Sequence, residues 1–209
     1  MSKNHSPNFR VAGVQLEFPN RSQIQQALDK LVATRTNVDL IVLSEYTLDG
    51  PPTEQLKNWC REHGKFLIVG GKDPTPGNNY YNTAFVISTN GEVVFKQVKS
   101  VPIQFFKDGL PAPEQKLWES PWGKIGICIC YDLCYTRVTD ELVRQGAQML
   151  IVPTMDVAEW GRASTRVARA RRAGARCGIR HPDFPRGEFR HFPRREQIRP
   201  GSIQRAVPG

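Results

Sequence analysis

The chain has 209 residues and a mass of 23.6 kDa, which is enough for one domain followed by a tail. Hydrophobic residues make up 39% and charged residues 23%, which allows a core and excludes collagen-like, coiled-coil and disulfide-scaffold proteins. No apolar run reaches the roughly 18–20 residues of a membrane-spanning helix, and the N-terminus lacks the apolar stretch of a secretory signal. Five cysteines, an odd number, favour a reduced cytoplasmic protein, for which we expect no membrane partner.

The net charge of +9 is concentrated at one end of the chain. Residues 1–161 hold 16 basic and 17 acidic side chains, whereas residues 162–209 hold 13 arginines, no lysine and three acidic residues. The second segment has no strand alternation and is punctuated by proline and glycine, which is typical of disordered chain. The sequence therefore predicts a domain over 1–161 and a disordered Arg-rich tail over 162–209.

The first half of the domain reads as alternating strands and helices. Apolar, β-branched runs predict buried strands at 9–16, 39–44 and 66–69. A helix capped by Ser22 is predicted after the first strand, and a second helix opens at Pro51 and stops at Gly64. The third strand is expected to end at Gly70.

The second half predicts a hairpin followed by a strand, a helix and a strand. The runs 84–88 and 92–98 flank Asn90-Gly91, a pair that tolerates the positive φ of a tight turn. Further on, we expect a strand at 125–130, a helix at 139–145 and a strand at 148–152. Alternating strands and helices with one inserted hairpin indicate a layered α/β domain, in which ligands gather beyond the carboxyl ends of strands.

Three reactive residues stand at the exits of predicted sheet elements: Glu45, Lys99 and Cys130. Each has a structural explanation on its own, since a cysteine ending an apolar strand is most often buried core. Glu45 could cap a turn, and Lys99 could be solvated beside Lys96. Together, however, they supply a nucleophile, a base and a cation able to face one pocket.

The order of these features resembles the nitrilase, or carbon–nitrogen hydrolase, superfamily over residues 9–161. The segments that carry the resemblance are VAGVQL, LIVLSEYTLDG, LIVGGKDPTPGNNYYNTAFVISTNGEVV, KSVPIQFF, GKIGICICYDLCY and GAQMLIVPTMD. The resemblance implies a nitrilase-like α-β-β-α sandwich, incomplete at its C-terminus, and a catalytic triad of Glu45, Lys99 and Cys130. It implies no cofactor or metal, and a homodimer formed through helices beside the cysteine.

The chemistry that the resemblance implies is hydrolysis of a small amide, nitrile or carbamoyl compound through a thioester. Glu45 would take the proton of Cys130 as sulfur attacks, and would then activate water. Lys99 and the backbone N–H of Tyr131 would stabilise the negative oxygen. The family often adds a second acid between the lysine and the cysteine, for which Asp108 is the nearest candidate and Glu114 the next.

The two other cysteines of the GICICYDLCY segment have a second interpretation. Cys128 is expected to face away from Cys130 into the core, and Cys134 to pack in the approach to the following helix. A metal site built from Cys128, Cys130 and Cys134 lacks a fourth ligand at useful spacing and a nearby histidine. We therefore expect no metal.

Other functions remain open at this point. Amidase or carbamoylase action is favoured over nitrile hydrolysis, and an N-acyltransferase is the alternative because KSVP resembles that branch, although its membrane helices are absent. Nucleic-acid binding is a different class: the arginines of the tail would contact phosphates, and three aromatic rings between them would stack on bases, namely Phe184, Phe189 and Phe192. A solvated or accidental charged tail is the favoured interpretation, so we expect no nucleic-acid partner.

The codons of the tail offer an explanation for its unusual composition, namely translation in a shifted reading frame. Read one nucleotide later, the codons of Val167 to Pro193 can encode LHARVAPVRAAEYGIPIFRVASSGIS, which resembles the family's continuation. The excess of arginine over lysine also fits a GC-rich frame shifted by one. We predict that residues after about Gly161 are translated out of frame and that the chain has weak or no activity. An intact upstream frame in the gene, without an insertion or deletion near that codon, would contradict this.

Overall fold

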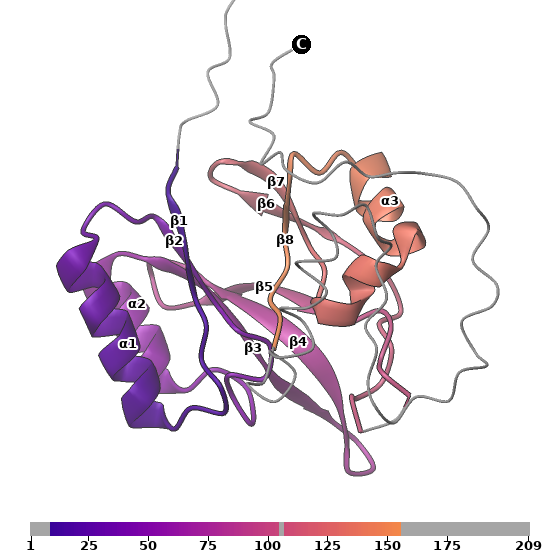
Figure 1. Ribbon diagram of the computed structural model, residues 1–209, viewed down its shortest axis with the longest axis horizontal. Coiled ribbons are helices and arrows are strands. Elements are labelled where there is room, and N and C mark those ends of the chain that lie inside the picture. The colour runs from indigo at the N-terminus through magenta and orange to yellow at the C-terminus, as the bar shows by residue number, and fades with distance from the viewer. Residues whose placement is uncertain (1–8, 105–106, 156–209) are drawn as a thin grey trace, which may run out of the picture. The chain divides into compact units, whose positions relative to one another are not determined.

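The computed structural model describes residues 9–104 and 107–155, which form two β-sheets flanked by helices (Figure 1). The predicted tail at 162–209 lies outside these residues. In the described part of the chain, no helix combines the length and apolar character needed to cross a bilayer.

The first sheet has five strands in chain order, with parallel pairing from β1 to β3 and antiparallel pairing from β3 to β5. These strands are β1 (Val11–Val14), β2 (Leu40–Leu43), β3 (Phe66–Thr75), β4 (Asn79–Ile87) and β5 (Val93–Val98). β3 does not end at Gly70 as predicted, because its second half pairs with β4 as far as Thr75. The predicted turn at Asn90-Gly91 is present between β4 and β5, and Gly91 has a φ of 75°.

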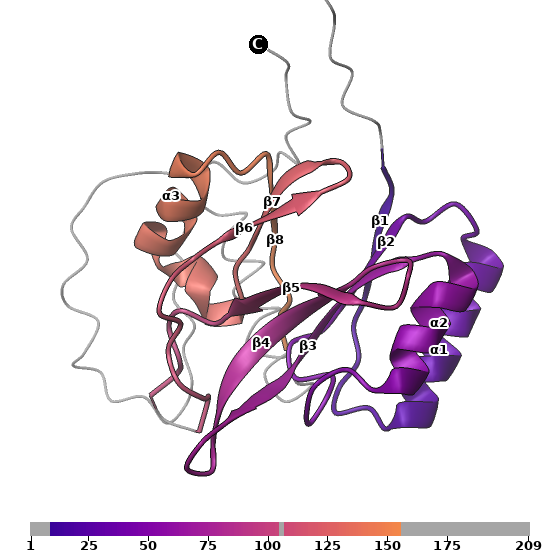
Figure 2. The same cartoon turned by 180° about the vertical axis from the view of Figure 1, so that it is seen from behind.

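Two helices cover one face of this sheet: α1 (Arg21–Thr34) and α2 (Glu54–His63) (Figures 1 and 2). Asn20, not Ser22, caps α1: its side chain accepts from the Gln23 N–H at 2.9 Å, and the Gln23 side chain accepts from the Asn20 N–H at 2.9 Å. This reciprocal pair satisfies two backbone donors, which favours a start one residue before the predicted cap. α2 ends where Gly64 takes a left-handed conformation.

The second sheet has three strands in the order β6, β7, β8. They are β6 (Leu117–Ser120), β7 (Gly123–Ile127) and β8 (Met149–Ile151), and the sequence did not predict β6. β7 ends before the predicted limit of 130, and the chain continues into a short 3₁₀ helix, η1 (Cys130–Cys134). Helix α3 (Thr136–Arg144) follows and packs on the outer face of this sheet through Val138 and Leu142.

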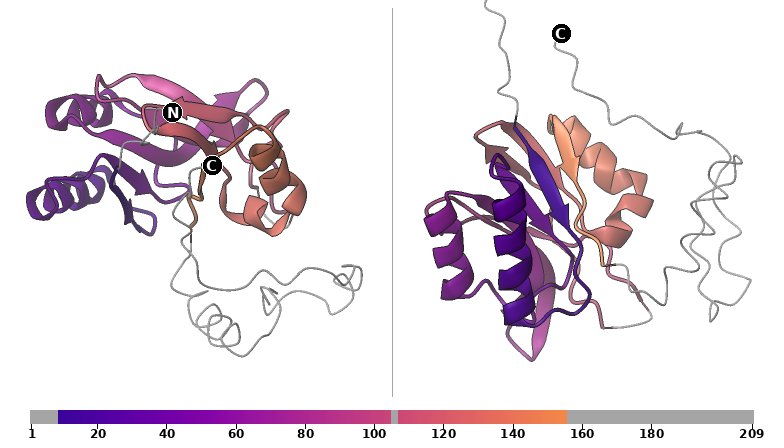
Figure 3. Two further views of the ribbon diagram at one scale, coloured as in Figure 1. Left: turned by 90° about the horizontal axis from the view of Figure 1, so that it is seen from above. Right: turned by 60° about the vertical axis from the view of Figure 1, so that its left-hand side comes forward.

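The two sheets pack face to face around a shared apolar core, with α1 and α2 on one side and α3 on the other (Figure 3). Residues of both sheets meet in this core, among them Leu40, Ile68, Val86, Trp118, Ile127 and Ile151. The predicted α-β-β-α sandwich is confirmed. Its strand ends bring the exits of β2, β5 and β7 to one region, where the candidate residues lie.

Candidate active site

Glu45 is placed by a close contact between two backbone segments. It lies two residues after the end of β2 and is only 3% exposed. Gly70 of β3 lies so near that a Cβ there would be 2.6 Å from the Glu45 Cα and 2.7 Å from the Ser44 carbonyl oxygen. Only a glycine leaves room for the chain to turn here. The Gly70 that was predicted to end a strand therefore seats the Glu45 turn instead.

Lys99 follows β5 and is fully buried between two carboxylates. Its Nζ lies 2.9 Å from Glu45 Oε1 and 2.7 Å from Asp108 Oδ2. Burial alone would lower the pKa of the Lys99 ammonium, but the charge of Glu45 and the contact with Asp108 outweigh it, so the net pKa is raised. Lys99 therefore stays charged at neutral pH.

Asp108 is the acid that joins this cluster, and Glu114 is not. The Asp108 carboxylate accepts hydrogen bonds from the Tyr46 hydroxyl at 2.7 Å and the Ile103 N–H at 2.7 Å. Glu114 instead pairs with Lys116 at the surface, where both side chains are about 60% exposed. Of the two candidates for a second acid, only Asp108 lies beside Lys99.

Cys130 sits at the turn from β7 into η1 with a φ of 49°, which is unusual for a residue other than glycine. Its N–H donates to the Pro153 carbonyl at 3.0 Å, which ties the turn to the segment after β8. Burial raises the pKa of the Cys130 thiol, and Glu45 adds to this by charge and hydrogen bonding, whereas Lys99 and the Met155 N–H lower it in part. The thiol is thus neutral at rest and close to both Glu45 and Lys99.

Cys128 and Cys134 are held apart from Cys130. Cys128 is fully buried under α3 with Val138 and Leu142, as predicted, while Cys130 contacts the core between the sheets. Residues two apart in a regular strand share a face, so it is the end of β7 and the positive φ that turn Cys130 inward. Cys134 is the last residue of the short 3₁₀ helix, at the approach to α3, and its side chain is exposed. Within residues 9–104 and 107–155, no three potential ligands cluster for a metal.

The backbone N–H of Tyr131 lies between two N–H groups that are already paired. Cys130 N–H donates to Pro153, and Asp132 N–H donates to the Ile129 carbonyl at 3.0 Å. The Tyr131 ring packs edge-on against the Tyr135 ring at a centroid distance of 5.2 Å. The ring therefore serves packing, and a role for Tyr131 in binding an oxyanion rests on its backbone.

Sequence reasoning missed three polar residues that organise the cluster: Asn82, Tyr46 and Asp132. The Asn82 amide donates to Glu45 Oε1 at 2.8 Å and to Asp108 Oδ1 at 2.9 Å, so it holds both carboxylates. Each of the three lies in a segment that already stood out in the sequence, YNT, SEY and CYD. For Tyr46 and Asp132, the available signal was a polar residue within two positions of a reactive one, but it does not say which side chains turn inward.

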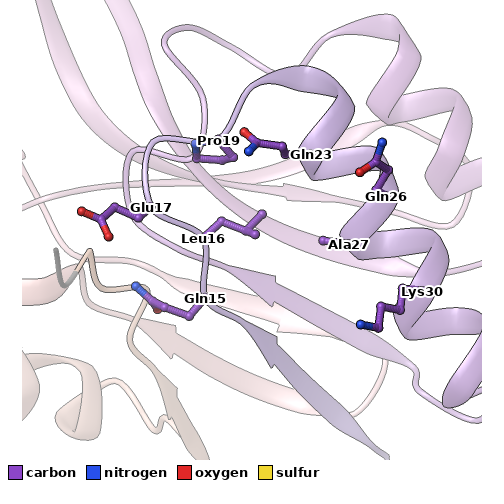
Figure 4. A pocket seen from close by; sticks show the side chains of 8 residues that line it. All are labelled: Gln15, Leu16, Glu17, Pro19, Gln23, Gln26, Ala27 and Lys30. Carbon is purple, nitrogen blue, oxygen red and sulfur yellow. The ribbon is translucent and has the colours of Figure 1, made fainter. Parts of the chain in front are cut away.

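A shallow hollow on the surface is separate from this cluster (Figure 4). Figure 4 shows its lining between the segment after β1 and helix α1, namely Gln15, Leu16, Glu17, Pro19, Gln23, Gln26, Ala27 and Lys30. Its lining does not include Lys99, Glu45 or Asp108. The lining mixes polar and apolar side chains and contains no cysteine, serine or histidine, so we assign the hollow no ligand.

The cluster combines one thiol, one ammonium and two carboxylates at the meeting point of two sheets. Lys99, Glu45 and Asp108 are buried, and Cys130 is the member that is partly exposed. A thiol with a carboxylate to take its proton and a cation beside it can add to a polarised carbon. The protein is therefore a layered α/β domain whose nucleophile candidate, Cys130, lies on a sharp turn between a strand and a short helix. We call this turn the cysteine elbow.

The profile of the carbon–nitrogen hydrolase family matches residues 10–177. The chain belongs to this family. The match extends past the predicted boundary at 161 into residues that the structure does not describe.

Relatives in sequence are formamidases. The chain is 32% identical over 157 residues to a formamidase from Bacillus cereus, which covers 62% of this chain and 46% of that protein. A formamidase from Bacillus thuringiensis is 29% identical over 176 residues, with 68% and 52% covered. The chain thus spans about half the length of the curated relatives it matches.

Solved structures share the fold at lower identity. A carbon–nitrogen hydrolase from Helicobacter pylori matches with a TM-score of 0.65 and 16% identity, covering 78% of this chain and 67% of that one. A mutant amidase from Nesterenkonia sp. matches with a TM-score of 0.62 and 15% identity, covering 80% and 73%. That amidase carries the acetamide moiety of fluoroacetamide at its active site cysteine.

Proposed function

We propose that this domain performs amidase-type hydrolysis of a non-peptide C–N bond, with Cys130 as nucleophile, Glu45 as base and Lys99 as oxyanion partner. The observation that carries the proposal is the buried Lys99–Glu45 contact of 2.9 Å beside the Cys130 thiol. A buried ion pair of this kind adds little to stability by itself, because desolvation offsets much of the attraction. Its placement at a nucleophile gives it a chemical purpose.

The first half of the reaction forms a thioester. As the Cys130 sulfur bonds to the amide carbon, its proton moves to Glu45 and the carbonyl oxygen becomes negative. Lys99 and the Tyr131 N–H stabilise that oxygen, and one such donor is typically worth about 3–4 kcal/mol. Glu45 then returns the proton to nitrogen, the C–N bond breaks, and ammonia or an amine leaves.

The second half consumes water. Glu45 takes a proton from water as the oxygen bonds to the thioester carbon, and the C–S bond breaks to release a carboxylic acid and the Cys130 thiol. If an amine took the place of water, the same steps would give an N-acyltransferase. The ratio of free acid to N-acyl product, measured with a plain amine in water, distinguishes the two activities.

We propose a small amide as the substrate, because the relatives in sequence are named formamidases. Formamide is the natural first compound to test. A thiol nucleophile must stay reduced, so a cytoplasmic setting suits the reaction. The curated relatives are about twice as long as the matched region. Since we predict weak or no turnover for a chain that is out of frame after about Gly161, turnover is measured against a frame-restored version, and this chain is tested by thiol labelling.

The experiment that tests the proposal is labelling with fluoroacetamide at neutral pH, read by mass spectrometry. Carbon–fluorine bonds resist ordinary thiols, so a label reports assisted attack by an activated sulfur. We expect labelling of Cys130 and none of Cys60, Cys128 or Cys134, and we expect Cys130→Ala to abolish the label. A label on exposed Cys134 at the same rate, or none on Cys130, would refute the proposal.

We also propose that the domain forms a homodimer over the surface beside the elbow. Leu133 of η1 and Val143 of α3 expose 55% and 59% of their surface, although both are large apolar residues. The family resemblance implies an interface formed by helices beside the cysteine, and both side chains belong to the two helices that begin at Cys130 and at Thr136. Light scattering should give twice the chain mass, and replacing both with Lys should restore the monomer.

A further inference from the structure

Asp132 is a buried carboxylate that contacts neither Glu45 nor Asp108. It is fully buried in the 3₁₀ helix η1, two residues after Cys130. Its Oδ1 accepts hydrogen bonds from the N–H groups of Val101 at 2.8 Å and Ser100 at 3.0 Å. Its Oδ2 accepts from the Ile129 N–H at 3.0 Å and from Ser100 at 3.2 Å.

The donors belong to two segments that are distant in sequence. Ser100 and Val101 follow Lys99 at the exit of β5, in the five-stranded sheet. Ile129 precedes Cys130 at the exit of β7, in the three-stranded sheet. One side chain therefore joins the backbone next to the cation to the backbone next to the nucleophile.

We propose that Asp132 is a positioning residue that fixes the spacing between the Lys99 ammonium and the Cys130 sulfur. This inference rests on the proposed function, but its geometry does not. Burial raises the pKa of the Asp132 carboxyl, and the hydrogen bonds from Ile129, Ser100 and Val101 oppose that rise. Both carboxyl oxygens accept these bonds, so their directions are set by the carboxylate plane. Three converging backbone donors leave that plane little freedom.

A change to asparagine, which has nearly the same volume, removes hydrogen bonds by which Asp132 joins the two segments. In Asp132→Asn, one oxygen becomes an NH₂ group, which would face backbone N–H groups and cannot accept from them. One of the two segments must then move away. Misplacing a reacting group by about 1 Å costs on the order of 100-fold in rate.

The test uses the full chain with two readouts. Fluoroacetamide labelling of Cys130 should slow by about 100-fold in Asp132→Asn. Amide exchange at Ser100, Val101 and Ile129 should accelerate in the same variant, and this readout needs no reactive thiol. Iodoacetamide labelling of Cys60, which is fully buried far along the chain in α2, reports global opening and should stay unchanged.

Asp29→Asn is the matched control, because Asp29 also joins two elements through one carboxylate. It accepts from the Trp59 indole N–H at 2.7 Å and ties α1 to α2. We expect this variant to leave Cys130 labelling and exchange at Ser100 and Val101 unchanged. A loss of Cys130 labelling equal to that of Asp132→Asn would show a general stability effect and overturn the inference.

The remaining outcomes are also decisive. If the unaltered chain fails to label at Cys130, the proposed function is wrong. Amide exchange at Ser100, Val101 and Ile129 then still tests whether Asp132 holds the two segments together. If labelling and exchange are unchanged in Asp132→Asn, the inference is wrong and the proposed function stands. If Asp132→Asn and Asp132→Ser both expose Cys60 as fast as they lose Cys130 labelling, Asp132 holds the fold and not the site, which also overturns the inference.

Discussion

Asn82 occupies a position that suits an uncharged amide. It is fully buried, and its two N–H bonds reach Glu45 and Asp108, while its oxygen has no hydrogen-bond partner among the described residues. Turning the amide over would direct its oxygen at two carboxylates, so the observed orientation is the favourable one. The amide separates two negative charges that share the single ammonium of Lys99. Without it, the carboxylates would repel each other at short range.

Gly70 offers the sharpest test of how Glu45 is positioned. In Gly70→Ala the new Cβ would lie 2.6 Å from the Glu45 Cα and 2.8 Å from the Tyr46 nitrogen, so the Glu45 turn must move. We expect fluoroacetamide labelling of Cys130 to fall at least tenfold and stability to drop by about 1–3 kcal/mol. Mass spectrometry and urea unfolding measure the two effects.

The control for this change is Gly13→Ala in β1. A Cβ at Gly13 meets no atom within 4 Å, so the same substitution adds no clash. Labelling should match that of the unaltered chain. Equal losses in both variants would mean that Gly70 matters for strand formation and not for the placement of Glu45.

At the scale of elements, the site depends on how the two sheets pack. Glu45 and Lys99 leave the five-stranded sheet, and Cys130 leaves the three-stranded one. Trp118 of β6 is 4% exposed at the interface between the sheets, with its ring centroid 5.7 Å from that of Phe66. Any loosening of this interface changes the distance from nucleophile to base.

Trp118→Ala should therefore weaken both stability and labelling. Removing a buried tryptophan typically costs about 3–5 kcal/mol, and the cavity would lie between the sheets. We expect the urea midpoint to fall and Cys130 labelling to be lost at lower urea than in the unaltered chain. Val94→Ala in β5 truncates a residue that is 46% exposed and should change neither. Unchanged labelling in folded Trp118→Ala would show that the site does not depend on this contact.

The element order could be predicted from sequence, because most strands are short apolar runs and the helices repeat apolar residues every three or four positions. The apolar run at 39–44 and the Asn90-Gly91 turn are local signals, and the structure keeps both. β6 was missed because LWES is four residues long and gains its stability from the facing core. The sandwich itself followed from the family resemblance, not from these periods.

Within the site, reactive residues were easier to predict than their supports. Glu45, Lys99 and Cys130 stood out because each ends an apolar run. Asn82 and Asp132 each have hydrogen-bond partners 26 to 37 positions away, and such pairs leave no local pattern. The early end of β7 depends on the backbone conformation of Cys130, which strand alternation cannot predict.

For the whole molecule, the buried thiols make the free energy of unfolding fall as the pH becomes alkaline. Burial raises the pKa of the Cys60 thiol to about 12 and that of the Cys128 thiol to about 12. An unfolded thiol ionises near pH 8.5, so the folded state binds more protons above that value. The stabilising effect is complete below about pH 8.5 and is lost as pH rises toward 12, by about 2 kcal/mol per thiol at pH 10.

Urea unfolding at pH 7 and pH 10 measures this effect in the unaltered chain and in Cys60→Ala. The variant should lose about 2 kcal/mol less than the unaltered chain over this range, because it has one buried thiol fewer. Leu56→Ala removes another core residue of α2 that cannot ionise, so its pH dependence should match that of the unaltered chain. Identical pH dependence in all three proteins would contradict the assignment to Cys60.

The left-handed backbone at Cys130 makes one position unfavourable for stability and necessary for the proposed chemistry. A side chain at a φ of 49° costs the folded state on the order of 1 kcal/mol, a penalty that glycine would escape. Directed evolution that rewards only survival of heating would then favour glycine there and erase the nucleophile. Retention of cysteine in such an experiment would need a second selection, for turnover.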